Sequence, residues 1–275
     1  MLEAPLAASL EILRGDPSDG FHVRMNATGV LLAGVVLWPY VRAPIALYRM
    51  PRTVFNPTLR LVADTDTLDP NVRAFIDQIE SVLRAAGFSE PQRIATSAES
   101  SLTSVESLME NSATGDLVNV VAILSTRATT MSPLVTAITY RSAFADGTLL
   151  QTSNTRNTGY WPDQPHHENV VMPDVRDALE LFRLHRTRVA RKSATVAQTM
   201  LTRGTSAEQR LTFATRQLLD STNFHIQCGY RKRSPEGMRL TVRGAILSAW
   251  RGLFPWKQLG QRRRQRAAAE VVRLA

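Results

Sequence analysis

Three apolar segments in the middle of the chain constrain the fold more than any other feature. Residues 117–124 (LVNVVAIL) form a nearly continuous run rich in β-branched residues, which is typical of a central strand. Residues 134–144 predict a second strand, and residues 148–153 predict the strand that returns. Asp146-Gly147 stands between these two and signals a tight hairpin, because both residue types accept a positive φ. Sequential strands with short turns and no helices between them predict an antiparallel β-meander.

An amphipathic helix precedes these strands. From Pro70 to Ala86 the apolar residues recur at helical spacing and form one stripe. Asp69 is suited to cap the first turn, with Pro70 as the first helical residue, and Gly87 is suited to end the helix. We expect this helix to pack on one face of the sheet, which a shorter strand at residues 93–97 joins.

The second half of the chain changes to a helical pattern. A long helix is predicted to begin at Asp174, and its back half is strongly cationic. A second helix is predicted at about residues 207–222, with Gly204 as the break between the two. These helices predict a connector between the sheet and the C-terminal segment.

The C-terminal segment predicts a small module of a hairpin and a helix. Residues 224–230 and 238–242 have the composition of two short strands, and residues 242–254 follow a helical pattern. The stretch 229–244 resembles the wing of winged-helix domains, in which a polar turn leads into a Leu-Thr-x-x-Gly sequence, here residues 240–244. The resemblance implies a wing-like module.

The fold class that follows is α+β: an antiparallel β-meander packed with an amphipathic helix, then a helical connector, then a basic hairpin-helix module. The predicted division of the chain has four parts. These are an N-terminal segment (1–52), an α+β body (53–172), a helical connector (173–223) and the basic C-terminal module (224–275).

The positive charge of the protein is concentrated at its C-terminal end. From Gly237 onward the chain has nine Lys and Arg and one acid, Glu270, which accounts for +8 of the formal net charge of +9. A balanced body with a cationic end points to a polyanionic partner, either the phosphates of nucleic acid or an anionic membrane surface. The predicted anion-contacting residues are Arg243, Arg251, Lys257, Arg262, Arg263, Arg264 and Arg266.

Residues 27–48 predict an N-terminal membrane anchor. Arg42 is the one charged residue in this segment, and a membrane-spanning helix needs about 20 predominantly apolar residues. Arg49 and Arg52 follow directly, which by the positive-inside rule keeps the body in the cytoplasm at a bacterial inner membrane. The alternatives are an apolar helix or strand of the core, which fits a cytoplasmic protein, or a secretory signal. Met25 stands just before the segment and is a candidate start of translation.

The loop at residues 154–173 holds the densest cluster of chemically versatile side chains. Adjacent histidines on a loop point in different directions, and no HExxH spacing is present, so a polar loop is favoured over a metal site. We therefore predict no metal and no cofactor, and the small-molecule ligand stays open. The candidate cluster comprises Tyr160, Asp163, His166, His167, Glu168 and His185.

Known catalytic motifs are missing from the sequence. It has no Gly-x-Ser-x-Gly elbow and no Gly-rich phosphate loop, and its single cysteine, Cys228, excludes an intramolecular disulfide and a thiolate zinc cluster. Whether the protein is an enzyme therefore stays open.

Three stretches resemble an uncharacterised bacterial protein family. They are residues 144–148 (FADGT), 152–154 (TSN) and 181–186 (LFRLHR). The resemblance implies an N-terminal membrane segment and a cytoplasmic α+β body, and it implies no activity.

Three functional hypotheses follow. The first is a membrane-associated, non-enzymatic binding or assembly protein. The second is a soluble nucleic-acid-binding protein that acts through the basic C-terminal module. The third is an enzyme with its site in the loop at residues 160–168.

Overall fold

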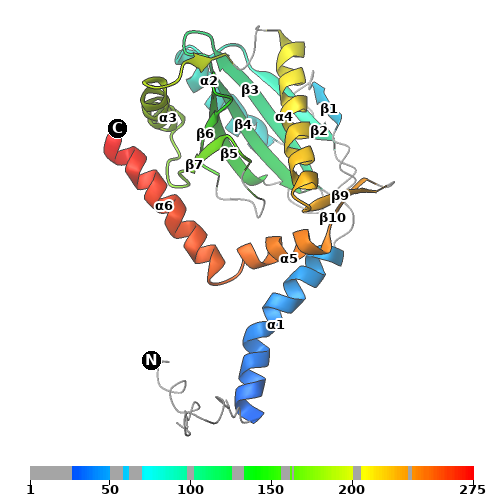
Figure 1. Cartoon of the computed structure of the whole chain (residues 1–275). Coiled ribbons are helices and arrows are strands. Elements are labelled where there is room, and N and C mark those ends of the chain that lie inside the picture. Colours follow the sequence, from blue (N-terminus) through cyan, green and yellow to red (C-terminus); the bar gives the residue numbers. More distant parts are fainter. Residues whose placement is uncertain are drawn as a thin grey trace.

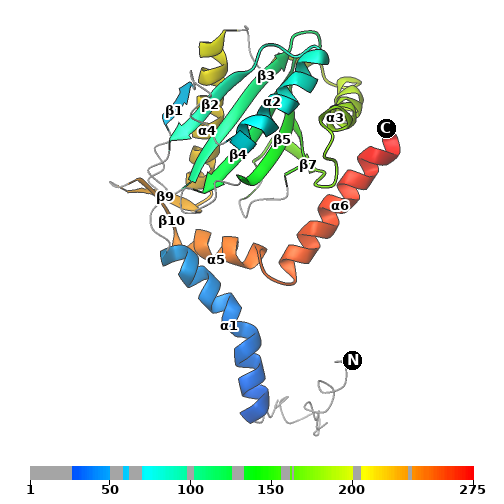
Figure 2. The ribbon, with the colours of Figure 1, turned by 180° about the vertical axis from the view of Figure 1, so that it is seen from behind.

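The computed structural model describes residues 27–49, 58–61, 70–97, 102–125, 133–155, 162, 164–200, 206–234 and 237–275. One large sheet has helices on both faces, and a helical arm extends from one end of this body (Figures 1 and 2). The predicted α+β class is confirmed.

The sheet has eight described strands. Seven of them follow one another across the sheet in sequence order, from β1 to β7, and β8 pairs with β5. Neighbours are antiparallel except β6 and β7, which run parallel and make the sheet mixed. The strands are β1 (Thr58–Leu61), β2 (Gln92–Ser97), β3 (Leu102–Asn111), β4 (Asp116–Ser125), β5 (Pro133–Phe144), β6 (Leu149–Ser153), β7 (His167–Val171) and β8 (Gln198–Thr199).

The strands predicted at residues 93–97, 117–124, 134–144 and 148–153 are confirmed as β2, β4, β5 and β6. No strand was predicted at the positions of β1, β3, β7 or β8. In the turn between β5 and β6, Gly147 has a positive φ of 80°, and the Asp146 side chain accepts a hydrogen bond from the Thr148 amide (2.9 Å). The local preferences of these turn residues therefore account for the hairpin.

The two faces of the sheet are covered by different helices. α2 (Pro70–Ala85) and α3 (Ala178–Ser193) lie on one face, and α4 (Ala207–Gln227) lies on the other (Figures 1 and 2). Side chains alternate along each strand, so Val118 and Val120 of β4 join the core under α2 and α3. Leu117 of the same strand packs with Phe213 of α4.

The predicted helix at residues 70–86 is confirmed as α2. Val72, Ile76 and Leu83 are fully buried against the sheet, as their helical spacing requires. Gly87 ends the helix with a φ of 88°, and the amide of Phe88 returns to the Leu83 carbonyl (3.1 Å). The predicted cap, Asp69, lies outside the described residues.

α3 and α4 begin at polar caps. The Asp177 side chain accepts from the Glu180 amide (2.7 Å), so α3 starts later than the predicted Asp174. Ser206 and Gln209 form a capping box at the start of α4. The strand predicted at residues 224–230 is wrong, because α4 continues to Gln227 and the next strand begins after it.

The C-terminal module consists of a hairpin and two helices. β9 (Arg231–Ser234) pairs with β10 (Gly237–Leu240), and α5 (Val242–Arg251) and α6 (Trp256–Leu274) follow. Thr241 caps α5 by accepting from the Gly244 amide (2.9 Å). The strand predicted at residues 238–242 and the helix predicted at residues 242–254 are confirmed as β10 and α5. The basic residues that follow form a separate helix, α6.

The predicted transmembrane anchor at residues 27–48 is wrong. The segment is helical, as α1 (Ala27–Arg49), but no helix in the described part of the chain combines the length and apolar character needed to cross a membrane. Arg42, Pro39 and Pro44 interrupt the apolar run. The core-helix alternative is not observed either, because Val35, Val36 and Leu37 are 58–71% exposed.

α1 instead packs with its C-terminal half on α5 (Figure 1). Pro44 has no amide hydrogen, so the Tyr40 carbonyl four residues earlier has no partner within the helix. The indole nitrogen of Trp250 donates to that carbonyl instead (3.1 Å). The proline that breaks the helical hydrogen-bond pattern thus creates the acceptor that joins α1 to α5.

Candidate functional site

The predicted anion-contacting residues lie on α5 and α6. Most of them are exposed, whereas Arg264 is half-buried. Within the described chain none of these seven residues forms an ion pair, and α6 has its one ion pair through Glu270, which binds Arg191 of α3 (3.0 Å). Their charge is therefore available to an anionic partner.

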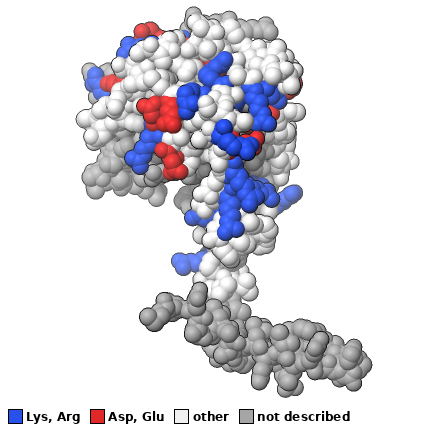
Figure 3. Space-filling view, turned by 90° about the vertical axis from the view of Figure 1, so that its left-hand side faces the viewer, with Lys and Arg blue, Asp and Glu red and all other residues white. Residues whose placement is uncertain are grey.

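The helical repeat groups the arginines of α6 on its solvent side. Arg262, Arg266 and Arg273 are spaced by four and seven residues, which is close to one and two helical turns. The opposite side carries Ala268 and Val271, which contact the main core. Figure 3 views the molecule from the side of α3 and α6 and shows the basic side chains gathered there in a band.

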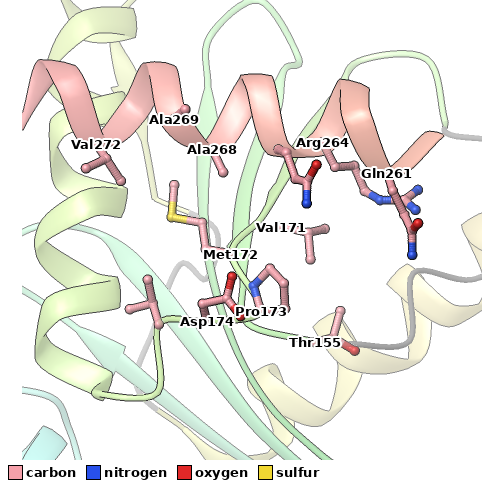
Figure 4. Close-up of a pocket in the computed structure, with 12 residues that line it drawn as sticks. Thr155, Val171, Met172, Pro173, Asp174, Gln261, Arg264, Ala268, Ala269 and Val272 are labelled. Carbon is pink, nitrogen blue, oxygen red and sulfur yellow. The ribbon is translucent and has the colours of Figure 1, made fainter. Parts of the chain in front are cut away.

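α6 is attached to the body mainly by its last turns. Val271 is buried, and Arg183 of α3 donates to the Ala275 carbonyl (3.3 Å). Beneath the middle of α6 lies a cavity of about 400 Å³ between the helix and the segment that follows β7 (Figure 4). Arg264 and Gln261 line one end of this cavity, and Val272 lines the other (Figure 4).

The β9–β10 hairpin adds further cations next to α5. Lys232 lies opposite Arg239 in the hairpin register, and both lack an ion pair among the described residues. The Arg251 guanidinium lies over the ring of Tyr230 (5.6 Å to the ring centre), a cation–π contact that leaves its positive charge in place. The hairpin, α5 and α6 together form what we call the C-terminal basic surface.

The described members of the predicted polar cluster do not converge on one site. Tyr160 and Asp163 lie outside the described residues. Glu168 pairs with Lys192 of α3 (2.9 Å), and His166 is exposed in a backbone conformation with a φ of 67°. His185 lies on α3 inside the core and has no exposed surface. Among the described residues no three His, Cys, Asp or Glu side chains converge on a possible metal position.

His185 belongs to a buried network that sequence analysis missed. Its Nε2 lies 2.8 Å from Ser142 Oγ, and its Nδ1 lies 2.9 Å from Thr152 Oγ1. Ser142 donates to Asp116 Oδ1, and Arg188 donates to Thr152 (2.7 Å). A sequence signal existed, because these polar residues occupy inward-facing positions of otherwise apolar strands.

The charged groups at the two ends of the network, Asp116 and Arg188, set the direction of every hydrogen bond between them. The Asp116 carboxylate can only accept, so the Ser142 hydroxyl donates its hydrogen to Asp116. The Ser142 oxygen must therefore accept from His185 Nε2–H. The unprotonated Nδ1 of His185 then accepts from Thr152, which accepts from Arg188. Asp116 is also bound by Arg186 (2.9 Å) and Gln198 (3.0 Å).

Although serine, histidine and aspartate occur together here, they are not arranged as a catalytic triad. In a triad the histidine lies between the other two, whereas here Ser142 lies between His185 and Asp116. All three have no exposed surface, so no substrate reaches them. The network therefore joins α3 to strands β4, β5 and β6.

Burial keeps the His185 ring neutral. Loss of hydration, followed by the positive charges of Arg188 and Arg186, holds the pKa of His185 well below its ordinary value. Burial also lowers the pKa of Arg188, to about 10, although Glu168 opposes this change. His185 Nε2 lies 3.8 Å from Asp116 Oδ1, but a neutral ring forms no ion pair.

We expect the free energy of unfolding to fall as the pH drops below about 6.5, because the unfolded chain then binds a proton on His185 that the folded chain excludes. This histidine contributes a slope of up to about 1.4 kcal/mol per pH unit. His225, whose pKa is also lowered by burial, adds to the slope in the same direction. Urea unfolding at a series of pH values measures the slope.

The variants that test this expectation are His185→Gln and, at an exposed position, His166→Asn. The first should flatten the pH dependence, and the second should keep it. An unchanged slope in His185→Gln would show that His185 is not the group responsible.

Comparison with protein-family models, with curated proteins and with solved structures gives no significant match. Function is therefore inferred from the geometry of the chain itself.

Proposed function

We propose that this protein binds nucleic acid through its C-terminal basic surface by contacts to the phosphate backbone. The observation that carries the proposal is the exposed arginine side of α6, whose cations have no acidic partner among the described residues. Arg262 and Arg266 lie about 6 Å apart along the helix axis, so a single backbone can contact both.

The hairpin supports the same function. Lys232 and Arg239 lie opposite each other on the hairpin that leads into α5, so they extend the cationic surface beyond that helix. Phosphate contacts orient a protein on nucleic acid but carry no sequence information. We therefore expect binding without strong sequence preference and without a catalytic step.

Salt dependence tests this function. Binding of the full chain to a short labelled DNA duplex and to single-stranded RNA is measured by fluorescence anisotropy at roughly 50–200 mM salt. The triple variant R262Q/R263Q/R266Q should bind at least about tenfold more weakly at the low end of this range. The slope of log affinity against log salt should become shallower by about 2–3.

A matched control removes the same charge elsewhere. Arg73 and Arg84 lie on α2 and Arg216 lies on α4, and neither helix belongs to the C-terminal basic surface, so R73Q/R84Q/R216Q should retain the affinity and slope. Substitution is preferable to truncation because Val271 of α6 is part of the core. Binding to phosphatidylserine vesicles with no binding to either nucleic acid would overturn the proposal in favour of an anionic membrane surface.

A further inference from the structure

A groove lies between α4 and the sheet, on the face opposite to the buried histidine network. Its volume is about 500 Å³, within the range of sites for small molecules. Polar side chains of β3 to β6 line one wall, and Phe213 and Leu218 of α4 line the other. The groove thus combines a few polar groups with an apolar surface, independently of the C-terminal basic surface.

Asn119 supplies an unpaired acceptor in this groove. Its side-chain nitrogen donates to Glu106 Oε2 (2.9 Å), and this contact sets the orientation of the amide because a carboxylate can only accept. The residue is 5% exposed, and its Oδ1 has no hydrogen-bond partner within the described chain. A buried acceptor without a donor costs free energy, and among the described buried atoms of this kind Asn119 Oδ1 is the one that belongs to a residue lining this groove, where a donor on a ligand can satisfy it.

Arg141 supplies unpaired donors beside it. The side chain is half-buried in the middle of β5, and its Nε donates to Gln151 Oε1 on β6 (3.1 Å). The described residues offer its guanidinium no further hydrogen bond and no ion pair. Loss of hydration lowers the pKa of Arg141, which Glu106 partly opposes. A dehydrated cation whose charge Glu106 offsets only in part favours an anionic ligand.

The donor and the acceptor are close enough for one small molecule to contact both. Asn119 lies opposite Thr139, and Arg141 is two residues further along β5 on the same face. Diagonal neighbours of this kind lie about 7–8 Å apart, with their Cβ atoms somewhat closer, a distance that long side chains span. Phe213 and Leu218 then lie across the groove, on α4.

We propose that this groove binds a small carboxylate that carries an amino or hydroxyl group on the neighbouring carbon and an apolar side chain. The carboxylate pairs with Arg141, and the amino or hydroxyl group donates to Asn119 Oδ1. The apolar side chain contacts Phe213 and Leu218. Glu106 beside Asn119 favours the amino form, because its carboxylate attracts an ammonium group.

Isothermal titration of the full chain with four related compounds tests the proposal. L-Leucine and 2-hydroxy-4-methylpentanoate contain every required group, 4-methylpentanoate lacks the donor, and 3-methylbutylamine lacks the carboxylate. The first two should bind, and the other two should bind at least about tenfold more weakly. No binding of the first two at millimolar concentration, or equal binding of all four, would overturn the proposal.

Two variants locate the ligand. Arg141→Gln and Asn119→Leu should each weaken binding of L-leucine at least about tenfold, while Arg84→Gln on α2 should leave it unchanged. Thermal unfolding of each variant establishes that it is folded. The variant R262Q/R263Q/R266Q should bind L-leucine as the natural chain does, so this test stands apart from nucleic-acid binding. Undiminished binding by folded Arg141→Gln would place the ligand elsewhere.

Discussion

Replacing Asp116 with alanine should lower the free energy of unfolding by about 3–5 kcal/mol, because the buried partners of the carboxylate lose their acceptor. Arg186, Gln198 and Ser142 all donate to this side chain, which has no exposed surface. Without it, the charge of Arg186 is left partly buried and unpaired, and the hydroxyl of Ser142 has no acceptor for its hydrogen. Urea unfolding followed by circular dichroism measures the loss.

A double-mutant cycle of Asp116→Ala and Arg186→Met measures the interaction energy of the Asp116–Arg186 ion pair apart from the rest of the network. If the two side chains interact as the geometry indicates, the double variant should be less destabilised than the sum of the single variants. Asp116→Asn retains one acceptor atom and should cost less than Asp116→Ala. A loss below about 1 kcal/mol in Asp116→Ala would contradict a tightly buried network.

The second large effect is expected at Gly244, in the first turn of α5. A Cβ atom at this position would lie 2.0 Å from the Tyr230 carbonyl oxygen, and this neighbour is backbone that cannot rotate away. Gly244→Ala must therefore separate α5 from the end of the hairpin, at a cost of about 3 kcal/mol or more. Thermal unfolding measures the destabilisation, and amide exchange in α5 locates it.

Gly260→Ala in α6 is the matched control, because Gly260 is also helical but its nearest neighbours are atoms of the flexible Arg264 side chain, at 3.5 Å or more. There the substitution should be neutral or stabilising by up to about 1 kcal/mol, as alanine is the better helix former. Similar destabilisation in both variants would show that the contact with Tyr230 is not the cause.

The predictions that succeeded rest on local signals. Helix α2 follows from its apolar spacing and from Gly87, which adopts the left-handed conformation that ends the helix. Strand β4 follows from its β-branched composition, and β5 and β6 follow from the two segments on either side of the Asp146-Gly147 turn. Each of these signals concerns residues close together in the chain, so it is readable without knowing what packs against them.

The predictions that failed depended on distant contacts. Residues 224–227 (FHIQ) alternate apolar and polar side chains as a strand does, but they form the end of α4, which packs on β9. The apolar run of α1 matched a membrane anchor in length, but the last part of that helix packs on α5 instead. The basic residues after Trp256 form α6 because Ala268 and Val271 contact the core.

The candidate sites show the same contrast between local signals and distant contacts. The arginines at residues 262–266 could be named as candidate anion contacts, because charge is a property of the residue type itself, but only the structure shows which of them share the solvent side of a helix. His185 was placed in the wrong cluster, because its hydrogen-bond partners, Ser142 and Thr152, come from strands β5 and β6, far from it in the sequence. Asn119 and Arg141 carried a usable signal, a polar side chain in the middle of an apolar strand, but their shared groove requires α4 across the sheet.

The sequence by itself determined the class of the fold, the positions of its most regular elements and the concentration of positive charge at the C-terminal end. These follow from spacing, turn residues and charge, which act over a few residues. The tertiary structure alone decided which polar residues meet. It buried His185 with Asp116 and Ser142 and brought Asn119 beside Arg141, because strand register and helix packing join residues far apart in the chain.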